Sequence, residues 1–344
     1  MSVRCFAPAL VLLLSAGLAV GCGPCDGTRA LCLLVEDAGP AFLSVQAPAD
    51  DDVWVVGTEA EPGVSGPTAL HFDGRAWESL DLSEHAGAEL WWVAPGEETT
   101  ILVGSEGLIL EYNRSDGSIE TIEATDPEIT FFGVWAPTNE VAWAVGGAID
   151  GGLEPQIWRR DAEGWTLFTD PALDGINPSQ TWFKVHGRAE DDLWIVGNLG
   201  RTLHWDGSSL TTFLLEGDLA GETLLTVDAG GDEPVAVGGF GAGVIVQWDG
   251  AAWVDRSPDF ASSINGVCSA GGTQRAVGAQ GAVYQPDAGG AWSFEPGGLT
   301  PRDYHGCAVS PGGDFWAVGG QIMMRPLDQG VIAYAGPQNL GAPL

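Results

Sequence analysis

Short apolar runs alternate with turn residues along most of the chain, and these runs recur in groups of four. In one group they cover residues 182–187, 192–197, 201–206 and 210–215, with the sequences WFKVHG, DLWIVG, RTLHWD and LTTFLL. Each run has the length of a β-strand and is rich in β-branched and aromatic residues, while Gly, Asp, Asn and Ser occupy the breaks. The pattern predicts four adjacent antiparallel strands in each group.

A Val-Gly pair marks every group and recurs at a nearly constant spacing of about 40 to 50 residues. The glycines of the seven pairs are Gly57, Gly104, Gly146, Gly197, Gly238, Gly278 and Gly319. Self-similarity with this period is typical of repeat architectures, and four-stranded antiparallel meanders arranged in a ring form a propeller. The sequence therefore predicts an all-β fold, a seven-bladed β-propeller of four-stranded blades over residues 40–344.

An Asp-Gly pair separates the third and fourth runs in three of the groups. The pairs are Asp73-Gly74, Asp206-Gly207 and Asp249-Gly250. Because this dipeptide readily adopts the positive φ angles of a type I′ turn, we expect it to join two antiparallel strands in a tight hairpin.

Tryptophan recurs three residues before the marker glycine, at Trp54, Trp143, Trp194 and Trp316. A large ring at the same place in successive units suits face-to-face packing of neighbouring blades, so we expect most of the 15 tryptophans to lie in the core. The combined pattern W-x-V-G followed by H-W-D-G-x-x-W resembles the repeats of kelch-like and sialidase-type (Asp-box, BNR) propellers of bacterial lipoproteins. It departs from Asp boxes because no Ser or Thr precedes the Asp.

The N-terminus combines one Arg, an apolar run from Ala7 to Val20 and small residues before Cys22. The run is too short for a membrane span and predicts a signal peptide over residues 1–21. The end of this segment, AVGC, resembles a bacterial lipobox, which implies lipid attachment at Cys22, an anchor and linker over residues 22–39, and membrane association through the lipid. Because Gly23 follows the cysteine, the resemblance implies the outer membrane, facing either the periplasm or the cell surface.

Acidic residues outnumber basic ones, 47 to 13, giving a formal net charge of -34. A surface this negative repels phosphate backbones, so nucleic-acid binding is excluded as a function class. The 51 glycines and 15 tryptophans indicate an ordered chain with many tight turns. We expect a monomer without a bound cofactor.

Four cysteines remain once Cys5 and the anchor are set aside, and an exported protein can oxidise them. They are Cys25, Cys32, Cys268 and Cys307. Three pairings are possible, and the simplest joins the first two and the last two, since Cys268 and Cys307 hold nearly equivalent positions in the first strands of the sixth and seventh groups. The seventh group offers four runs between Tyr304 and Ala335, so we expect no exchange of strands between the termini.

The first strand of each blade faces the central channel, and Gln46, Trp135 and His186 occupy equivalent places in it. Lys184 and Arg188 lie beside His186 and form the densest basic cluster in this acidic protein. These five residues are candidate ligand-binding residues for an anionic ligand. The alternative is that neighbouring carboxylates satisfy the basic side chains.

Three insertions break the repeat, at Thr58–Thr68, Gly147–Pro155 and Asp170–Gln180. All three fall on the propeller face that carries the second-to-third strand loops and the links between blades. Because binding groups tend to lie on loops held by a rigid scaffold, this face is a candidate binding surface. The alternative is that the insertions are tolerated surface loops.

Catalytic and metal-binding patterns are weak. His71 and His204 occupy the same repeat position in distant blades, so they cannot share a metal ion, and the acidic runs at 50–52 and 190–192 lack the alternating spacing of a calcium loop. We predict no metal site and no catalytic set.

The preferred function is a binding or scaffolding module for a protein or glycan ligand, and the alternative is a hydrolase or lyase acting on glycans or polyanions through the axial pocket.

Overall fold

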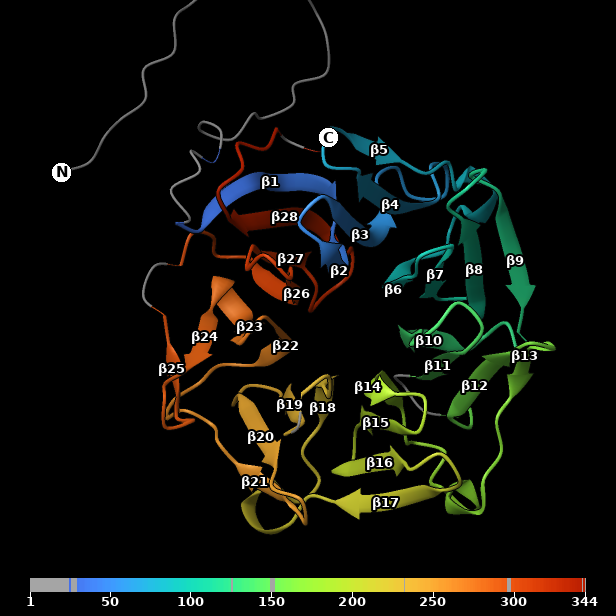
Figure 1. Ribbon diagram of the computed structural model, residues 1–344, viewed down its shortest axis with the longest axis vertical. Coiled ribbons are helices and arrows are strands. Elements are labelled where there is room, and N and C mark those ends of the chain that lie inside the picture. The colour runs from blue at the N-terminus through green and yellow to red at the C-terminus, as the bar shows by residue number, and fades with distance from the viewer. Residues whose placement is uncertain are drawn as a thin grey trace, which may run out of the picture.

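The computed structural model describes residues 30–124, 126–148, 152–231, 233–295 and 298–341, together with Cys25 and Pro343. The predicted signal peptide over 1–21 and the predicted lipid-bearing Cys22 lie outside the described residues. The described chain forms seven four-stranded antiparallel sheets arranged as blades around a central axis (Figure 1). The predicted all-β, seven-bladed propeller is confirmed.

The first four blades follow one another in sequence order, each with its first strand at the axis. Blade 1 contains β2 (Phe42–Ala49), β3 (Asp52–Glu59), β4 (Pro67–Phe72) and β5 (Trp77–Ser79). Blade 2 contains β6 (Leu90–Pro95), β7 (Thr99–Gly104), β8 (Leu108–Asn113) and β9 (Ile119–Glu123). Blade 3 contains β10 (Thr130–Trp135), β11 (Ala142–Gly147), β12 (Gln156–Asp161) and β13 (Gly164–Leu167). Blade 4 contains β14 (Trp182–Ala189), β15 (Asp192–Gly197), β16 (Arg201–Trp205) and β17 (Leu210–Leu214).

The remaining blades complete the ring, and the last one is made from both ends of the chain. Blade 5 contains β18 (Leu224–Asp228), β19 (Val235–Gly238), β20 (Val244–Trp248) and β21 (Trp253–Asp255). Blade 6 contains β22 (Ile264–Ala270), β23 (Thr273–Gly278), β24 (Val283–Pro286) and β25 (Trp292–Phe294). Blade 7 contains β26 (Asp303–Val309), β27 (Phe315–Gln321), β28 (Asp328–Ala335) and β1 (Cys32–Pro40). Short 3₁₀ turns lie at η1 (Ser83–His85), η2 (Pro171–Leu173), η3 (Gly217–Leu219) and η4 (Ala279–Gly281).

The expectation that blade 7 is built from C-terminal residues alone is wrong. Strand β1 pairs antiparallel with β28, from Cys32 opposite Tyr334 to Pro40 opposite Asp328 (Figure 1). Residues 32–39, expected to belong to the linker, are therefore part of the propeller's last sheet. Exchange between the termini supplies the outer strand that β28 would otherwise lack, and the hydrogen bonds of β1 close the ring.

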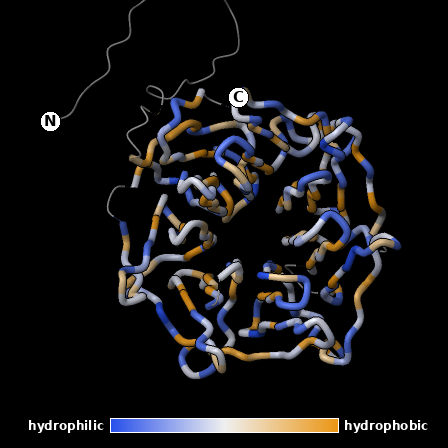
Figure 2. The backbone as a smooth tube through the Cα atoms, viewed as in Figure 1, coloured by the Kyte–Doolittle hydropathy of each residue, from blue (hydrophilic) through white to orange (hydrophobic). Residues whose placement is uncertain are grey.

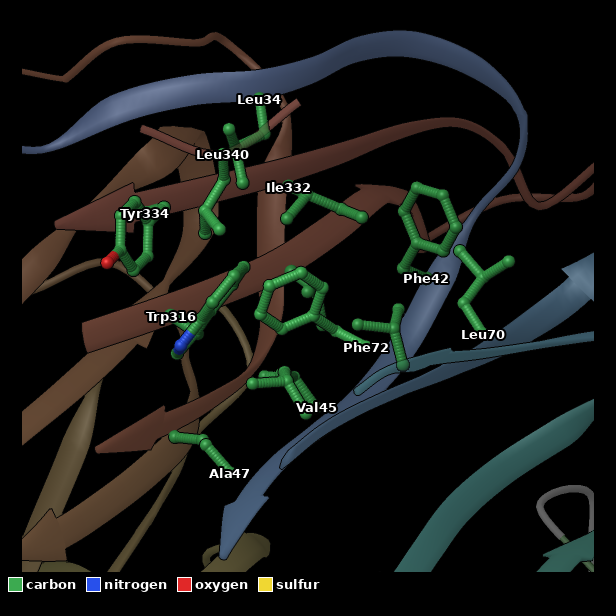
Figure 3. Packing of buried hydrophobic residues seen from close by; sticks show 14 of the residues in the cluster. Leu34, Phe42, Val45, Ala47, Leu70, Phe72, Trp316, Ile332, Tyr334 and Leu340 are labelled. Carbon is green, nitrogen blue, oxygen red and sulfur yellow. The ribbon is translucent and has the colours of Figure 1, made fainter. Parts of the chain in front are cut away.

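Seven apolar clusters fill the seams between blades, and each combines residues of two neighbours. The seam of blades 7 and 1 brings Trp316 against Phe72 and Val45 (Figure 3). The predicted burial of the repeat tryptophans is confirmed, because Trp54, Trp143, Trp194 and Trp316 are all at most 3% exposed. Most second strands are buried along nearly their whole length, for example β11 and β15, whereas the first half of β23 is polar and only partly buried. Hydrophobic segments recur around the ring (Figure 2).

The Asp-Gly pairs join adjacent strands as predicted, but the predicted turn type is wrong. Only the glycine has a positive φ, for example +88° at Gly207, whereas a type I′ turn needs two such residues. The Asp206 side chain instead accepts hydrogen bonds from the backbone N–H groups of Ser208 and Ser209, each at 2.9 Å. The Asp therefore organises the turn through its carboxylate and not through its own backbone conformation.

Both predicted disulfides are present. Cys25 pairs with Cys32 at the start of β1, and Cys268 pairs with Cys307 across the first strands of blades 6 and 7. Their Cα atoms are 5.7 and 5.8 Å apart. Within the described residues, no helix has the length and hydropathy needed to cross a membrane.

Candidate functional site: the axial pocket

All seven first strands carry a β-bulge at the same place, where the pairing register with the second strand shifts by one residue. A bulge changes the direction of the side chain it displaces. The bulged residues, one from each blade, are Leu43, Trp91, Phe132, Phe183, Leu225, Asn265 and His305. This ring occupies the half of the channel nearer the links between blades, because each bulge lies in the first half of its strand.

Aromatic rings from four blades meet in this half of the channel. The ring centroid of Trp91 lies 5.1 Å from that of Phe132 and 5.7 Å from that of His305, and Phe132 lies 5.3 Å from Phe183. These contacts join blades 2, 3, 4 and 7 across the axis. The rings therefore close the channel on the side of the links between blades and form the floor of the space on the other side.

A cavity of about 250 Å³ lies above this floor and is lined by the second halves of all seven first strands. One equivalent lining position per blade is occupied by Gln46, Ala94, Trp135, His186, Asp228, Cys268 and Ala308. Since these residues precede the first-to-second strand turns, the pocket opens on that face. The described residues of the three long insertions lie on the opposite face, and none of them lines the pocket.

Lys184 lies next to the floor of the pocket and is only 3% exposed. Its Nζ atom donates a hydrogen bond of 2.8 Å to the carbonyl oxygen of Phe132 and lies 3.1 Å from the centroid of the Trp92 ring. Among the described residues it forms no ion pair. Burial holds the pKa of this ammonium well below its usual range, because nothing negative compensates for the lost water.

His305 shares this region and is held neutral. Burial, together with the nearby positive charge of Lys184, lowers the pKa of His305 to about 4. Its Nδ1 atom hydrogen-bonds the carbonyl oxygen of Leu43, which requires a proton on Nδ1. The floor of the pocket thus contains a lysine amine whose charged form is disfavoured by burial, together with an uncharged imidazole.

His186 and Asp228 lie on one side of the pocket, on neighbouring blades. The Nδ1 atom of His186 accepts a hydrogen bond of 2.9 Å from the backbone N–H of Ala229, which leaves the proton on Nε2. Burial lowers the pKa of His186, although Asp228, with Oδ1 at 3.5 Å, raises it in part. The Oδ2 atom of Asp228 is buried and has no hydrogen-bond partner among the described residues.

The structure brings together four of the five candidate ligand-binding residues. Gln46, Trp135, Lys184 and His186 all line the axial pocket. Arg188 lies outside it, with a 48% exposed side chain that pairs with Asp192. Whether any of these residues binds a ligand stays a prediction.

Two residues that line the axial pocket, Asp228 and Trp92, were not among the candidates predicted from the sequence. Asp228 occupies the same repeat position as Gln46, Trp135 and His186, so an alignment of all seven first strands would have found it. Trp92 occupies the position equivalent to Lys184. Both equivalences are hidden because the turn between the first and second strands is one residue shorter in blades 2 and 5 than in blade 4, which changes the spacing to the marker glycine.

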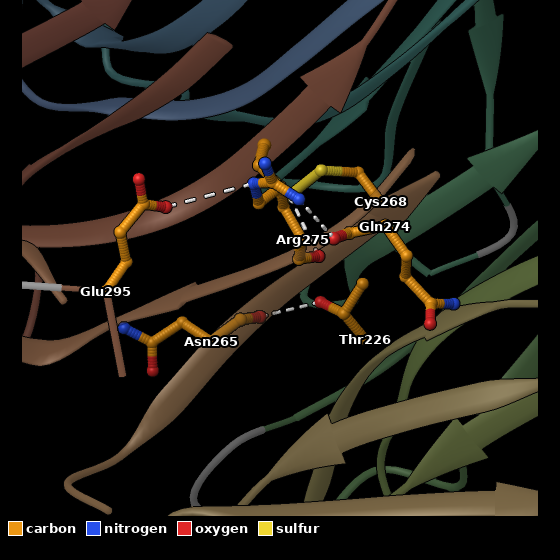
Figure 4. The surroundings of a disulfide bond; sticks show 7 residues. Thr226, Asn265, Cys268, Gln274, Arg275 and Glu295 are labelled. Atoms are coloured by element: carbon orange, nitrogen blue, oxygen red, sulfur yellow. Dashed lines mark hydrogen bonds and ion pairs between the residues drawn. A yellow bond between two sulfur atoms is a disulfide. The ribbon is translucent and has the colours of Figure 1, made fainter. Parts of the chain in front are cut away.

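Covalent and hydrogen-bonded links join blades 5, 6 and 7 at the wall of the pocket. The Cys268–Cys307 disulfide crosses from blade 6 to blade 7 (Figure 4). Both cysteines line the pocket. The hydroxyl of Thr226 donates a 2.7 Å hydrogen bond to the carbonyl oxygen of Asn265, which ties blade 5 to blade 6 (Figure 4). A wall linked in this way holds its lining side chains in fixed positions.

Solved structures with the same architecture cover almost the whole chain. A catalytically inactive virginiamycin B lyase from Staphylococcus aureus, solved with quinupristin, has a TM-score of 0.71, 11% identity and coverage of 89% of this chain and 99% of its own. YCF48 from Cyanidioschyzon merolae has a TM-score of 0.64, 13% identity and coverage of 90% and 100%. The WD40 propeller domain of Doa1 has a TM-score of 0.61, 11% identity and coverage of 88% and 96%.

These similarities show the fold alone. No family model and no curated protein matches the sequence. The propeller thus resembles a lyase, YCF48 and a WD40 domain in structure, and the function of its site has to be inferred from its own residues.

Proposed function

We propose that this chain is a binding module of the cell envelope, anchored through a lipid at Cys22, that takes a carboxylate of its ligand into the axial pocket. The observation that carries the proposal is Lys184, a buried amine that lines the cavity and has no ion-pair partner among the described residues to favour its charged form. A buried charge is costly unless it is paired, and a ligand carboxylate supplies the missing partner.

The size of the pocket favours the end of a larger ligand over a complete small molecule. Pockets for drug-sized ligands usually measure about 300–1,000 Å³, and this cavity, at about 250 Å³, lies below that range. The indole rings of Trp92 and Trp135 supply apolar surface, while Asp228 and the Nε2–H of His186 supply polar contacts. A chain end of a protein ligand, with one carboxylate and one apolar side chain, matches this combination. YCF48, which shares the architecture, has been solved bound to a D1 peptide.

The enzyme alternative would need a convergent reactive set at the same place. The described lining residues include one carboxylate, Asp228, and no arginine, so a pair of carboxylates with a clamping Arg is not assembled there. A binding role therefore fits these groups better than glycosidic or polyanion cleavage does.

The test is a binding measurement with short peptides that carry either a free or an amidated C-terminus. We expect the free carboxylate to bind at least about tenfold more tightly, the ratio that one charge-assisted hydrogen bond of about 1.5 kcal/mol gives. Lys184→Met, which keeps the length of the side chain and removes its charge, should abolish this preference. Arg75→Met, which removes an exposed cation, is the matched control.

Two results would contradict the proposal. One is an unchanged preference for free carboxylates in Lys184→Met, given a protein that retains its thermal transition. The other is turnover of glycan or polyanionic substrates that is lost when His186 is replaced by Asn, because that would assign the pocket to catalysis.

A further inference from the structure

A second hollow lies between blades 4 and 5, outside the axial pocket. It has a volume of about 660 Å³ and is lined by the aromatic rings of Trp194, Trp248 and Phe213 and by carboxylates. The carboxylates are Asp191, Asp192 and Asp206. Because Asp191 and Gly250 belong to the first-to-second and third-to-fourth strand hairpins, this groove opens on the same face as the axial pocket.

The equivalent seam between blades 1 and 2 is filled by an arginine of the chain itself. Arg114 Nη2 donates a 2.8 Å hydrogen bond to Asp52 Oδ2, and its Cζ atom lies 5.7 Å from the centroid of the Trp54 ring. The other oxygen of Asp52 is 2.8 Å from His71 Nε2, and His71 stacks on Trp54 with centroids 4.2 Å apart. An Asp, a His and a Trp thus form a seat that holds a guanidinium group.

The same seat exists between blades 4 and 5. Asp192 Oδ1 is 2.8 Å from His204 Nε2, and His204 stacks on Trp194 with ring centroids 4.5 Å apart. Trp248, with its centroid 4.7 Å from that of Trp194, takes the place of Tyr112 in blade 2.

Strand pairing shows which residue replaces Arg114. In blade 2, Ile101 is opposite Glu111, and in blade 5 the equivalent Val235 is opposite Gln247. Three residues further along, the position of Arg114 in blade 2 is therefore that of Gly250 in blade 5. Gly250 lines the groove, and a Cβ atom placed on it would meet nothing within 4 Å.

We propose that the groove between blades 4 and 5 binds an arginine side chain of a partner protein. The guanidinium takes the place that Arg114 fills in the first seam, beside the Asp192 carboxylate and against the partly buried indole of Trp248. Arg188 donates to Asp192 Oδ2 from the first strand of blade 4, so the incoming group shares this carboxylate and also meets Asp191 and Asp206. Among the described residues that line the groove, three carboxylates face one arginine, and this net negative charge complements a cation.

The probe is a pentapeptide with one arginine between glycines and with both termini blocked, so that it carries no carboxylate for Lys184. Calorimetry should detect binding to the full chain, and a citrulline peptide should bind at least about tenfold more weakly, since it lacks the charge. Gly250→Arg should abolish binding by filling the groove from within. Gly250→Ala is the matched control, because it has the same backbone cost at a φ of +97° and leaves the groove open.

A gain of binding gives the sharper test. Arg114→Ala should open the equivalent seat in the first seam and raise the stoichiometry from one arginine peptide per chain to two. Equal binding of the arginine and citrulline peptides, or full binding by Gly250→Arg, would overturn the proposal. Lys184→Met should leave this binding unchanged, so failure here and failure of the carboxylate pocket are distinguishable.

Discussion

At the scale of single residues, the seven marker glycines hold the repeat together through a close contact between strands. A Cβ atom placed on any of them would lie 1.9 to 2.2 Å from a backbone carbonyl oxygen at the start of the first strand. None of the seven has a positive φ. The glycine is therefore required by the approach of two backbones and not by an unusual conformation.

We predict that Gly238→Ala destabilises the protein by about 1–3 kcal/mol, the usual cost of an overpacked core. The nearest backbone atoms are Thr223 O at 2.0 Å and Leu224 Cα at 2.8 Å, which belong to the strand start and cannot rotate away. Gly231→Ala in the same blade is the control, because it is exposed and its Cβ atom would meet nothing within 4 Å. Chemical denaturation measures the free energy of unfolding of both variants. Equal stabilities of the two variants would show that the close approach is not a constraint.

At the scale of elements, strand β1 decides whether the ring is closed. It covers β28, contributes the buried Leu34 to the seam of blades 7 and 1, and is fixed by the Cys25–Cys32 disulfide. Without it, β28 would expose an unpaired edge rich in apolar residues, VIAYA. Such an edge is a template for pairing with another chain.

We predict that a chain of residues 41–344, which lacks β1, loses its cooperative thermal transition and aggregates. The control is a chain of residues 30–344 with Cys32→Ser, which keeps the strand and lacks the disulfide. Its free energy of unfolding should be lower by about 2–3 kcal/mol than that of the protein with the Cys25–Cys32 disulfide, as expected for a short disulfide loop. Calorimetry and light scattering compare the two. A sharp, monomeric transition for the shorter chain would mean that closure does not depend on β1.

At the scale of the whole molecule, carboxylates dominate both the charge and the response to acid. The chain carries a formal net charge of -34, and hairpin carboxylates are stabilised in their ionised form. Hydrogen bonds from Ser208 and Ser209 lower the pKa of Asp206 to about 2, for example. A strongly negative surface also speeds the encounter with cationic partners, so binding of the arginine peptide should weaken as salt is added.

The buried His305 adds a specific response to pH. Its pKa is lowered to about 4 in the folded protein, so between pH 6.5 and 4 the unfolded chain binds a proton that the folded chain does not. The free energy of unfolding therefore has its full value, as far as His305 is concerned, above pH 6.5, and it decreases as the pH drops towards 4. The full shift corresponds to a few kcal/mol, about 1.4 kcal/mol per unit.

We predict that His305→Asn reduces the loss of unfolding free energy between pH 7 and pH 4.5. Asparagine keeps an N–H donor for the carbonyl oxygen of Leu43 and cannot titrate. Urea denaturation at the two pH values measures the change in each protein. An identical pH dependence in the variant would show that His305 does not contribute to acid sensitivity.

Much of the fold and part of the site were predictable from the residues. The spacing of the marker glycines gave seven blades, the aromatic positions gave the packing between them, and the position of Cys268 and Cys307 in equivalent strands gave a disulfide. Gln46, Trp135, Lys184 and His186 were placed in the channel correctly, because first strands always face the axis. The turn type was wrong, since an Asp carboxylate can replace a backbone conformation in organising a hairpin.

What the sequence determined by itself is the repeat, because the hydrophobic pattern and the Val-Gly pair are local features that appear in every blade. The tertiary structure decided three things that depend on contacts between distant residues. It placed β1 in the last blade, where β28 has an unpaired edge that becomes apparent only once the ring is closed. It separated Arg188 from Lys184, because residues four apart on a bulged strand face different surroundings. It also left Lys184 without an ion-pair partner among the described residues and Gly250 opposite an open seat, and both depend on which blades become neighbours.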